Sequence, residues 1–181
     1  MSTISVTYAE AVCPVLAQRR SRAWLMATGV CVIALLSELQ ARYALVWVVG
    51  DSMQPTICSS TLVLVSKLAY SDTTPCRDDL VVARCRKELI AKRIVGLPGE
   101  RVGVKLGVLH IDGKAVAERH SIRPGYLTIE AGTLFAGRYA LLGDNRDLTA
   151  AATVHAVVEK DQIVGKVVAQ LPRLPLQNAA N

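Results

Sequence analysis

The chain has 181 residues, of which 51% are hydrophobic, so it is long and apolar enough to fold as one domain with a core, and it does not belong to the disordered class. The net charge is +6 and the pI is about 9.2, but the basic residues are scattered and only 4% of the residues are aromatic. This composition shows no stacking platform for nucleic acid, and it fits an anionic membrane surface equally well.

Residues 1–22 are predicted to be an N-terminal tail, and residues 23–42 a membrane-anchor helix. The uncharged run 23–36 has fourteen residues, which is short against the roughly twenty of a full membrane span. An arginine-rich stretch, residues 19–22, precedes this run, and Trp24 lies at its edge. These features favour an anchor that places the rest of the chain on the trans side. A cleaved signal peptide and a soluble buried helix remain open as alternatives.

Residues 43–171 are predicted to form one mainly β domain, followed by a C-terminal tail over residues 172–181. Runs of branched, aromatic and alternating residues indicate strands, and turn residues separate them. Asp112-Gly113 between two short apolar runs is typical of a hairpin. Residues 118–133 are polar and predict a loop with at most one short strand. The other predicted strands cover residues 43–49, 61–66, 79–84, 89–95, 101–105, 137–142 and 163–171.

A turn over residues 50–57, Gly-Asp-Ser-Met-Gln-Pro-Thr-Ile, contains the candidate nucleophile Ser52. Pro55 restricts the residue before it to extended geometry, so the turn is pre-set to present a hydroxyl. A serine hydroxyl needs a neighbouring base, and the three histidines of the chain form no recognisable triad motif. Lys92 is the candidate base, because apolar neighbours on a strand can desolvate its ammonium and lower its pKa.

Three motifs occur in order: the serine turn, then Lys-Arg-Ile-Val-Gly-Leu-Pro-Gly-Glu beginning at Lys92, then Gly-Asp-Asn-Arg over residues 143–146. Together they resemble the type I signal peptidases, a family of Ser/Lys proteases, from about residue 50 to about residue 163. The resemblance implies a signal-peptidase-like antiparallel β-sheet catalytic domain with Ser52 as nucleophile and Lys92 as general base. The small size of the chain looks most like a mitochondrial inner-membrane protease subunit. The supporting residues that the resemblance implies are Gly50, Asp51, Met53, Pro55, Gly143, Asp144, Asn145, Arg146 and Thr149.

The third motif departs from the family pattern after Arg146. Thr149 stands where the family has a serine that helps to hold the lysine, and its hydroxyl can still bond an amine. Ala151, Ala152 and Thr153 stand where the family has Asp, Ser and Arg. The loss of that acid and that arginine removes a supporting ion pair, which leaves the lysine loop less rigid without deleting the chemistry.

No metal or other cofactor is expected. The five cysteines contain no C-x-x-C pair, and the histidines lie far from them in the sequence, so a structural zinc site is not indicated. Their odd number excludes complete internal pairing, and buried or free thiols are the simpler interpretation.

The resemblance implies a membrane-bound serine endopeptidase that removes N-terminal signal or sorting presequences through an acyl-enzyme. Neutral Lys92 would take the proton of Ser52, and the backbone N–H of Ser52 would help to hold the oxyanion. Met53, Pro55 and residues 62–65 are placed by the resemblance near the substrate cleft, where an extended peptide would add a strand.

The expected location is the mitochondrial inner membrane with the catalytic domain facing the intermembrane space, and the alternative is a bacterial plasma membrane with the catalytic domain outside. The expected partners are precursor proteins with cleavable presequences, membrane lipid and a paralogous partner subunit, with no nucleic acid.

Three other functions stay open. One is a bacterial signal peptidase or a conjugation-associated maturation protease. Another is a self-cleaving Ser/Lys regulator of the repressor type, which would want a DNA-binding helix-turn-helix ahead of the serine. The third is a non-catalytic partner subunit of a processing complex, against which the retained Ser52 and Lys92 argue.

Overall fold

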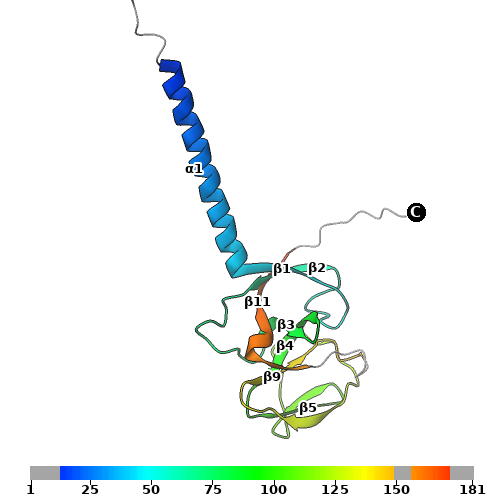
Figure 1. Ribbon diagram of the computed structural model, residues 1–181. Helices are drawn as coiled ribbons and strands as arrows, with labels where there is room; N and C mark the ends of the chain where they lie inside the picture. The colour runs from blue at the N-terminus through cyan, green and yellow to red at the C-terminus, as the bar shows by residue number, and fades with distance from the viewer. Residues whose placement is uncertain (1–12, 149–155, 172–181) are drawn as a thin grey trace, which may run out of the picture. The chain divides into compact units, whose positions relative to one another are not determined.

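The computed structural model describes residues 13–148 and 156–171, and the chain divides into two compact units (Figure 1). The first unit, Met1–Ala41, contains nearly all of one long helix. The second unit, Arg42–Asn181, contains the strands.

Helix α1 spans Cys13–Arg42, so it begins well before the predicted start at residue 23. The helix therefore includes residues 13–22 of the predicted tail. Pro14 is compatible with the first turn of a helix, where its missing N–H would have no intrahelical partner, and the residues after it are mostly good helix formers. The stretch Trp24–Arg42 has 19 residues and a mean hydropathy of 1.6, which is long and apolar enough to cross a membrane.

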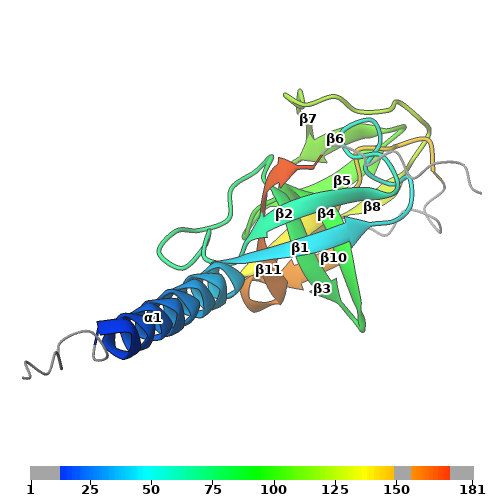
Figure 2. The same ribbon diagram turned by 90° about the horizontal axis from the view of Figure 1, so that it is seen from above.

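The second unit is built from two antiparallel sheets, and Figure 2 shows β1 and β2 side by side in the larger one. The larger sheet has the order β1-β2-β11-β3-β4-β9-β10, and the smaller sheet has the order β7-β6-β5-β8. The strands of the larger sheet are β1 (Tyr43–Val48), β2 (Thr61–Ser66), β3 (Leu80–Cys85), β4 (Glu88–Gly96), β9 (Arg138–Leu142), β10 (Ala156–Glu159) and β11 (Ile163–Gln170). Those of the smaller sheet are β5 (Arg101–Lys105), β6 (Val108–Ile111), β7 (Lys114–Ala115) and β8 (Ile129–Thr133). A short 3-10 helix, Lys160–Gln162, precedes β11.

The predicted antiparallel, mainly β fold with one N-terminal apolar helix is confirmed, and the predicted strands outside the hairpin end within one residue of the observed ones. In β2 successive side chains point to opposite faces, which puts Thr61, Val63 and Val65 in the interior. The hairpin around Asp112-Gly113 is formed by β6 and β7, and β8 is the one short strand within residues 118–133. Strand β10 was not predicted.

Two groups of buried side chains fix the position of the serine turn and of the lysine strand. Beneath the turn, Met53 and Ile57 pack with apolar residues of β1, β2 and β3. Between the two sheets, Val95 of β4 and Leu142 of β9 pack with Val104 of β5. The serine turn and the ends of β4 and β9 are therefore each held by packed interior side chains.

Candidate active site

The serine turn follows β1 directly and is held by bonds of its own. Gly50 has a φ of +100°, in the region that favours glycine, and this lets the chain reverse direction just before Ser52. The N–H of Gln54 donates to the carbonyl of Asp51 at 3.1 Å, and the Gln54 side chain donates to the Asp51 carboxylate at 2.7 Å. Met53, only 1% exposed, anchors the turn in the core, so the Ser52 hydroxyl is presented from a rigid support.

Lys92 lies on β4, and its side chain reaches the hydroxyl of Ser52. Its Nζ donates to Ser52 Oγ at 2.5 Å, although the two residues are forty positions apart. The Lys92 residue is 4% exposed. Burial lowers the pKa of Lys92 to about 8, and the nearby Asp144 carboxylate opposes this fall. A lysine with this pKa is neutral in a useful fraction of molecules near neutral pH. The contact between Nζ and Oγ also shows that the structure brings together the two residues that the sequence paired.

The Gly-Asp-Asn-Arg motif lies between β9 and β10 and is hydrogen-bonded to the serine turn. The N–H of Asn145 donates to the carbonyl of Ser52 at 3.1 Å, and its side-chain amide donates to the carbonyl of Asp51 at 3.0 Å. Gly143 lies so close that a Cβ there would come within 2.3 Å of the Ser52 carbonyl oxygen. The motif thus fixes the backbone on both sides of the hydroxyl.

Asp144 joins the serine turn to the lysine strand. Its carboxylate is fully buried and accepts two hydrogen bonds from Arg93, from Nε at 2.9 Å and from Nη2 at 2.7 Å. It also accepts from the Thr56 hydroxyl at 2.5 Å. Arg93 follows Lys92 directly on β4 and Thr56 belongs to the serine turn, so one buried carboxylate holds both halves of the pair in register.

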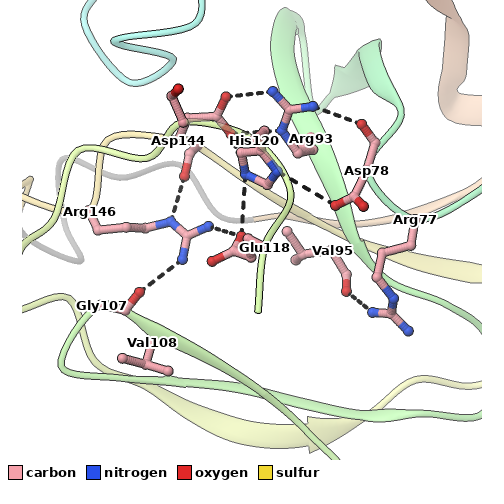
Figure 3. A network of polar contacts seen from close by, with 12 residues as sticks. Arg77, Asp78, Arg93, Val95, Gly107, Val108, Glu118, His120, Asp144 and Arg146 are labelled. Carbon is pink, nitrogen blue, oxygen red and sulfur yellow. Dashed lines mark hydrogen bonds and ion pairs between the residues drawn. The ribbon is translucent and has the colours of Figure 1, made fainter. Parts of the chain in front are cut away.

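Arg146 is also fully buried and organises the loop around it (Figure 3). Its guanidinium donates to the carbonyls of Gly143 at 2.8 Å and Gly107 at 3.0 Å, and to the carboxylate of Glu118 at 2.5 Å. Gly107 and Glu118 both belong to the chain between β5 and β8. The motif is therefore tied to the smaller sheet as well as to the serine turn.

Sequence reasoning missed several residues of this network. Arg93 and Thr56 lie inside the motifs, but no role was assigned to them. An arginine next to the buried candidate base could have indicated that a carboxylate pairs with it, which is the role of Asp144. Glu118 and His120 gave no comparable signal, because they lie in a polar stretch with no periodicity. Thr149, together with the replaced positions 151–153, lies outside the described residues.

A cleft with a volume of about 400 Å³ leads to the serine and the lysine. Residues 46–52, residues 88–92 and Leu148 line it. Met53, Pro55 and residues 62–65 were expected near this cleft, but they are not among its lining residues. Met53 instead packs into the core beneath the turn.

Among the described residues, no group of three or more His, Cys, Asp or Glu side chains is placed to hold a metal ion. Cys31, Cys58, Cys76 and Cys85 are free thiols.

Ser52 and Lys92 thus bring a hydroxyl nucleophile and a buried amine base together in the lining of one cleft, which is the combination that a Ser/Lys hydrolase requires. The chain matches the family described as "Signal peptidase, peptidase S26" over residues 21–171. It therefore belongs to the S26 signal peptidase family.

Relatives with curated names agree with this assignment. The chain is 35% identical to "Signal peptidase I" of Bacillus caldolyticus, over 83% of this chain and 90% of that protein. It is 28% identical to "Signal peptidase IB" of Staphylococcus aureus, over 65% of this chain and 72% of that protein. A crystal structure of a signal peptidase I from Enterococcus faecalis V583 aligns at 24% identity and a TM-score of 0.42, covering 52% of this chain and 97% of that chain. The Bacillus and Staphylococcus relatives are bacterial, so they give the expected likeness to a mitochondrial subunit no support.

Proposed function

We propose that this protein is a membrane-anchored signal peptidase of a bacterial plasma membrane, with its catalytic domain outside. In this proposal it removes N-terminal signal sequences from precursor proteins. The observation that carries the chemistry is the 2.5 Å contact between Lys92 Nζ and Ser52 Oγ, made by a lysine whose pKa burial lowers to about 8. The bacterial relatives favour this membrane over the mitochondrial inner membrane, which remains a prediction from chain size alone.

The proposed reaction begins with neutral Lys92, which accepts the proton of the Ser52 hydroxyl as Oγ attacks the scissile carbonyl. The developing oxyanion is held by the backbone N–H of Ser52, since Gly50 offers no side chain for this purpose. Lysine Nζ then gives the proton to the leaving amine, and an acyl-enzyme on Ser52 remains. The same amine next deprotonates a water molecule, which releases the signal sequence and restores the serine.

The cleft suggests how a precursor would be held. Residues 46–49 and residues 88–91 form two walls that lead toward Ser52 and Lys92, a shape that suits an extended peptide bound as an added strand. Leu45, Trp47 and Val49 expose apolar side chains from β1 and the residue after it, which fits a lipid surface as a second partner. A paralogous partner subunit stays a prediction from the resemblance.

Purified full-length protein in detergent, incubated with a secretory precursor, tests this function. Ser52→Ala and Lys92→Arg are each expected to lower kcat/KM by about three orders of magnitude or more, because the first removes the nucleophile and the second leaves a guanidinium that cannot act as a base. The wild-type rate is expected to rise with pH through about 8 and then level off, since the amine must lose its proton to act.

Ser71→Ala and Lys105→Arg serve as matched controls, because both residues are exposed and lie outside the cleft. They are expected to keep the wild-type rate. Cleavage that persists in a folded Ser52→Ala variant, or a rate that is already maximal at pH 5, would rule out the proposed pair.

A further inference from the structure

A loop that the sequence left without a role lies directly against the Gly-Asp-Asn-Arg motif. The N–H of Arg123 donates to the carbonyl of Asp144 at 2.9 Å, and the N–H of Arg146 donates to the carbonyl of Arg123 at 2.9 Å. Gly125 packs so closely that a Cβ there would come within 2.1 Å of the Arg146 carbonyl oxygen. The segment 118–125, called the covering loop below, is therefore fastened to the motif through its backbone.

The covering loop places one imidazole beside the carboxylate that joins the serine turn to the lysine strand. His120 Nε2 lies 3.4 Å from Asp144 Oδ1 and 3.4 Å from Glu118 Oε1, and Nδ1 lies 3.6 Å from Asp78 Oδ1. The His120 side chain is 10% exposed, and both ring nitrogens are fully buried without a well-formed hydrogen bond among the described residues. Figure 3 shows the ring in the middle of this group.

The charged groups around the imidazole come from four parts of the fold. Three carboxylates and two guanidinium groups face this region, which leaves one formal negative charge in excess. They are Asp78 before β3, Arg93 on β4, Glu118 on the covering loop, and Asp144 and Arg146 after β9. Arg93 and Arg146 are paired with Asp144 and Glu118, and an N–H donor from His120 can offset part of the negative charge that remains.

We propose that His120 is a positioning residue of the Ser52/Lys92 pair, whose Nε2–H faces the Asp144 carboxylate at 3.4 Å and, beside the bonds from Arg93 and Thr56, offsets part of its negative charge. This inference rests on the proposed function, because it concerns the same pair. His120 touches neither the serine nor the lysine, and it acts on them through Asp144.

The charge state of His120 decides how it acts. Burial lowers the pKa of His120, the neighbouring Arg93 lowers it further, and the three carboxylates oppose both. The imidazole is therefore neutral in the pH range where Lys92 loses its proton. It works as a dipole with its N–H toward Asp144, rather than as a cation.

Removing the N–H donor of His120 is expected to raise the pKa of Lys92. Asp144 favours the ammonium form of Lys92. With less compensation from His120, the Asp144 carboxylate acts more strongly on that ammonium and raises the pKa of Lys92. The fraction of neutral base at pH 7 then falls, and the rising limb of the pH profile moves to higher pH.

The test compares full-length wild type with His120→Leu and His120→Gln. Leucine fills the site without a donor, whereas glutamine keeps an N–H donor near the place of Nε2 and cannot ionise. We expect His120→Leu to move the rising limb of kcat/KM upward by about 0.5 to 1 pH unit, and His120→Gln to restore the wild-type profile. His110→Leu is the matched control, because His110 lies on β6 and is bonded to the carbonyl of Val108.

A second measurement does not depend on activity. The 13Cε signal of Lys92, assigned by its absence from Lys92→Arg, reports its titration directly and should shift in the same direction in His120→Leu. Equal Lys92 titration in the wild type and in a folded His120→Leu variant would overturn the role of His120, and so would a shift in His120→Leu that His120→Gln does not reverse. If the wild type shows no cleavage that depends on Ser52, the proposed function fails, while the Lys92 titration still decides whether His120 sets the pKa of the amine.

Discussion

Burial of the Lys92 amine makes its charged form costly in the folded protein. Its amine is buried against a neutral hydroxyl, and the nearest opposite charge, Asp144, is already occupied by two bonds from Arg93. The pKa of about 8 is the result, against an ordinary value of 10.5. The same desolvation that makes the lysine a base must therefore weaken the folded state wherever the amine is protonated.

A stability measurement on Lys92→Met can detect this penalty. In the folded protein Lys92 binds its proton only below about pH 8, whereas in the unfolded chain it does so up to about 10.5. The penalty is thus fully present below pH 8 and is relieved as the pH rises toward 10.5. We expect Lys92→Met to raise the free energy of unfolding by up to about 3 kcal/mol at pH 6 to 7, with a gain that shrinks toward pH 10.

Denaturant unfolding of both proteins between pH 6 and pH 10 provides the measurement. Lys105→Met, at an exposed site on β5, should show no pH-dependent difference from wild type. A Lys92→Met gain that is constant with pH would mean that packing, and not protonation, is responsible.

Single residues of the site differ in how far the sequence could reveal them. Ser52 was predicted because its turn can present a hydroxyl, and Lys92 because apolar neighbours on a strand can lower its pKa; the family resemblance implied their roles and supplied the Gly-Asp-Asn-Arg motif. The roles of its members could not be read in this way. Asp144 and Arg146 act through partners on β4 and on the covering loop, and only the folded chain brings those segments together. His120 had no signal of its own, because an isolated histidine in a polar stretch resembles any solvated loop residue.

Hydrogen bonds join the serine turn to the Gly-Asp-Asn-Arg motif after β9. These bonds run from Asn145 to Ser52 and Asp51, and Gly143 allows the close approach. A run of aromatic and branched residues predicted the strand before the serine turn, and the strand before the motif was predicted over residues 137–142. Strand β10, which has only four residues, was not predicted. The start of α1 was also missed, because no strong helix breaker separates residues 13–22 from the apolar run.

Gly143→Ala tests whether this close approach positions the serine. The new Cβ would come within 2.3 Å of the Ser52 carbonyl oxygen, so the turn or the motif must shift. We expect a fall in kcat/KM of about 100-fold, because a displacement on the order of 1 Å is enough for such a loss, together with a destabilisation of about 1 to 3 kcal/mol.

Gly132→Ala on β8 is the matched control, since a Cβ there meets nothing within 4 Å and the variant should be close to wild type. Both activity and thermal unfolding should be measured. Wild-type kcat/KM in Gly143→Ala would show that the serine turn does not depend on the motif.

The whole molecule combines two units with opposite surface chemistry. The β unit has a buried apolar core, while the helix exposes Trp24, Leu25, Ile33, Leu35 and other apolar side chains over the stretch Trp24–Arg42. A soluble protein rarely leaves such a length of apolar helix in water, because each buried methylene is worth about 0.8 kcal/mol. A lipid bilayer would remove these apolar side chains from water, which agrees with membership of a family of membrane-anchored peptidases.

Membrane extraction of the full-length protein tests this placement. We expect the wild type to remain in the pellet after alkaline carbonate treatment, and protease added on the trans side to digest the β unit. Changing Ile33 and Leu35 together to arginine should release a large share of the protein, because each arginine near the middle of a span disfavours insertion by about 2.5 to 3.5 kcal/mol. The matched pair of alanine substitutions keeps the stretch apolar and should leave the protein in the pellet. If carbonate released the wild type as readily as the arginine variant, the helix would not be an anchor, and precursors would have to reach Ser52 from solution rather than from the membrane.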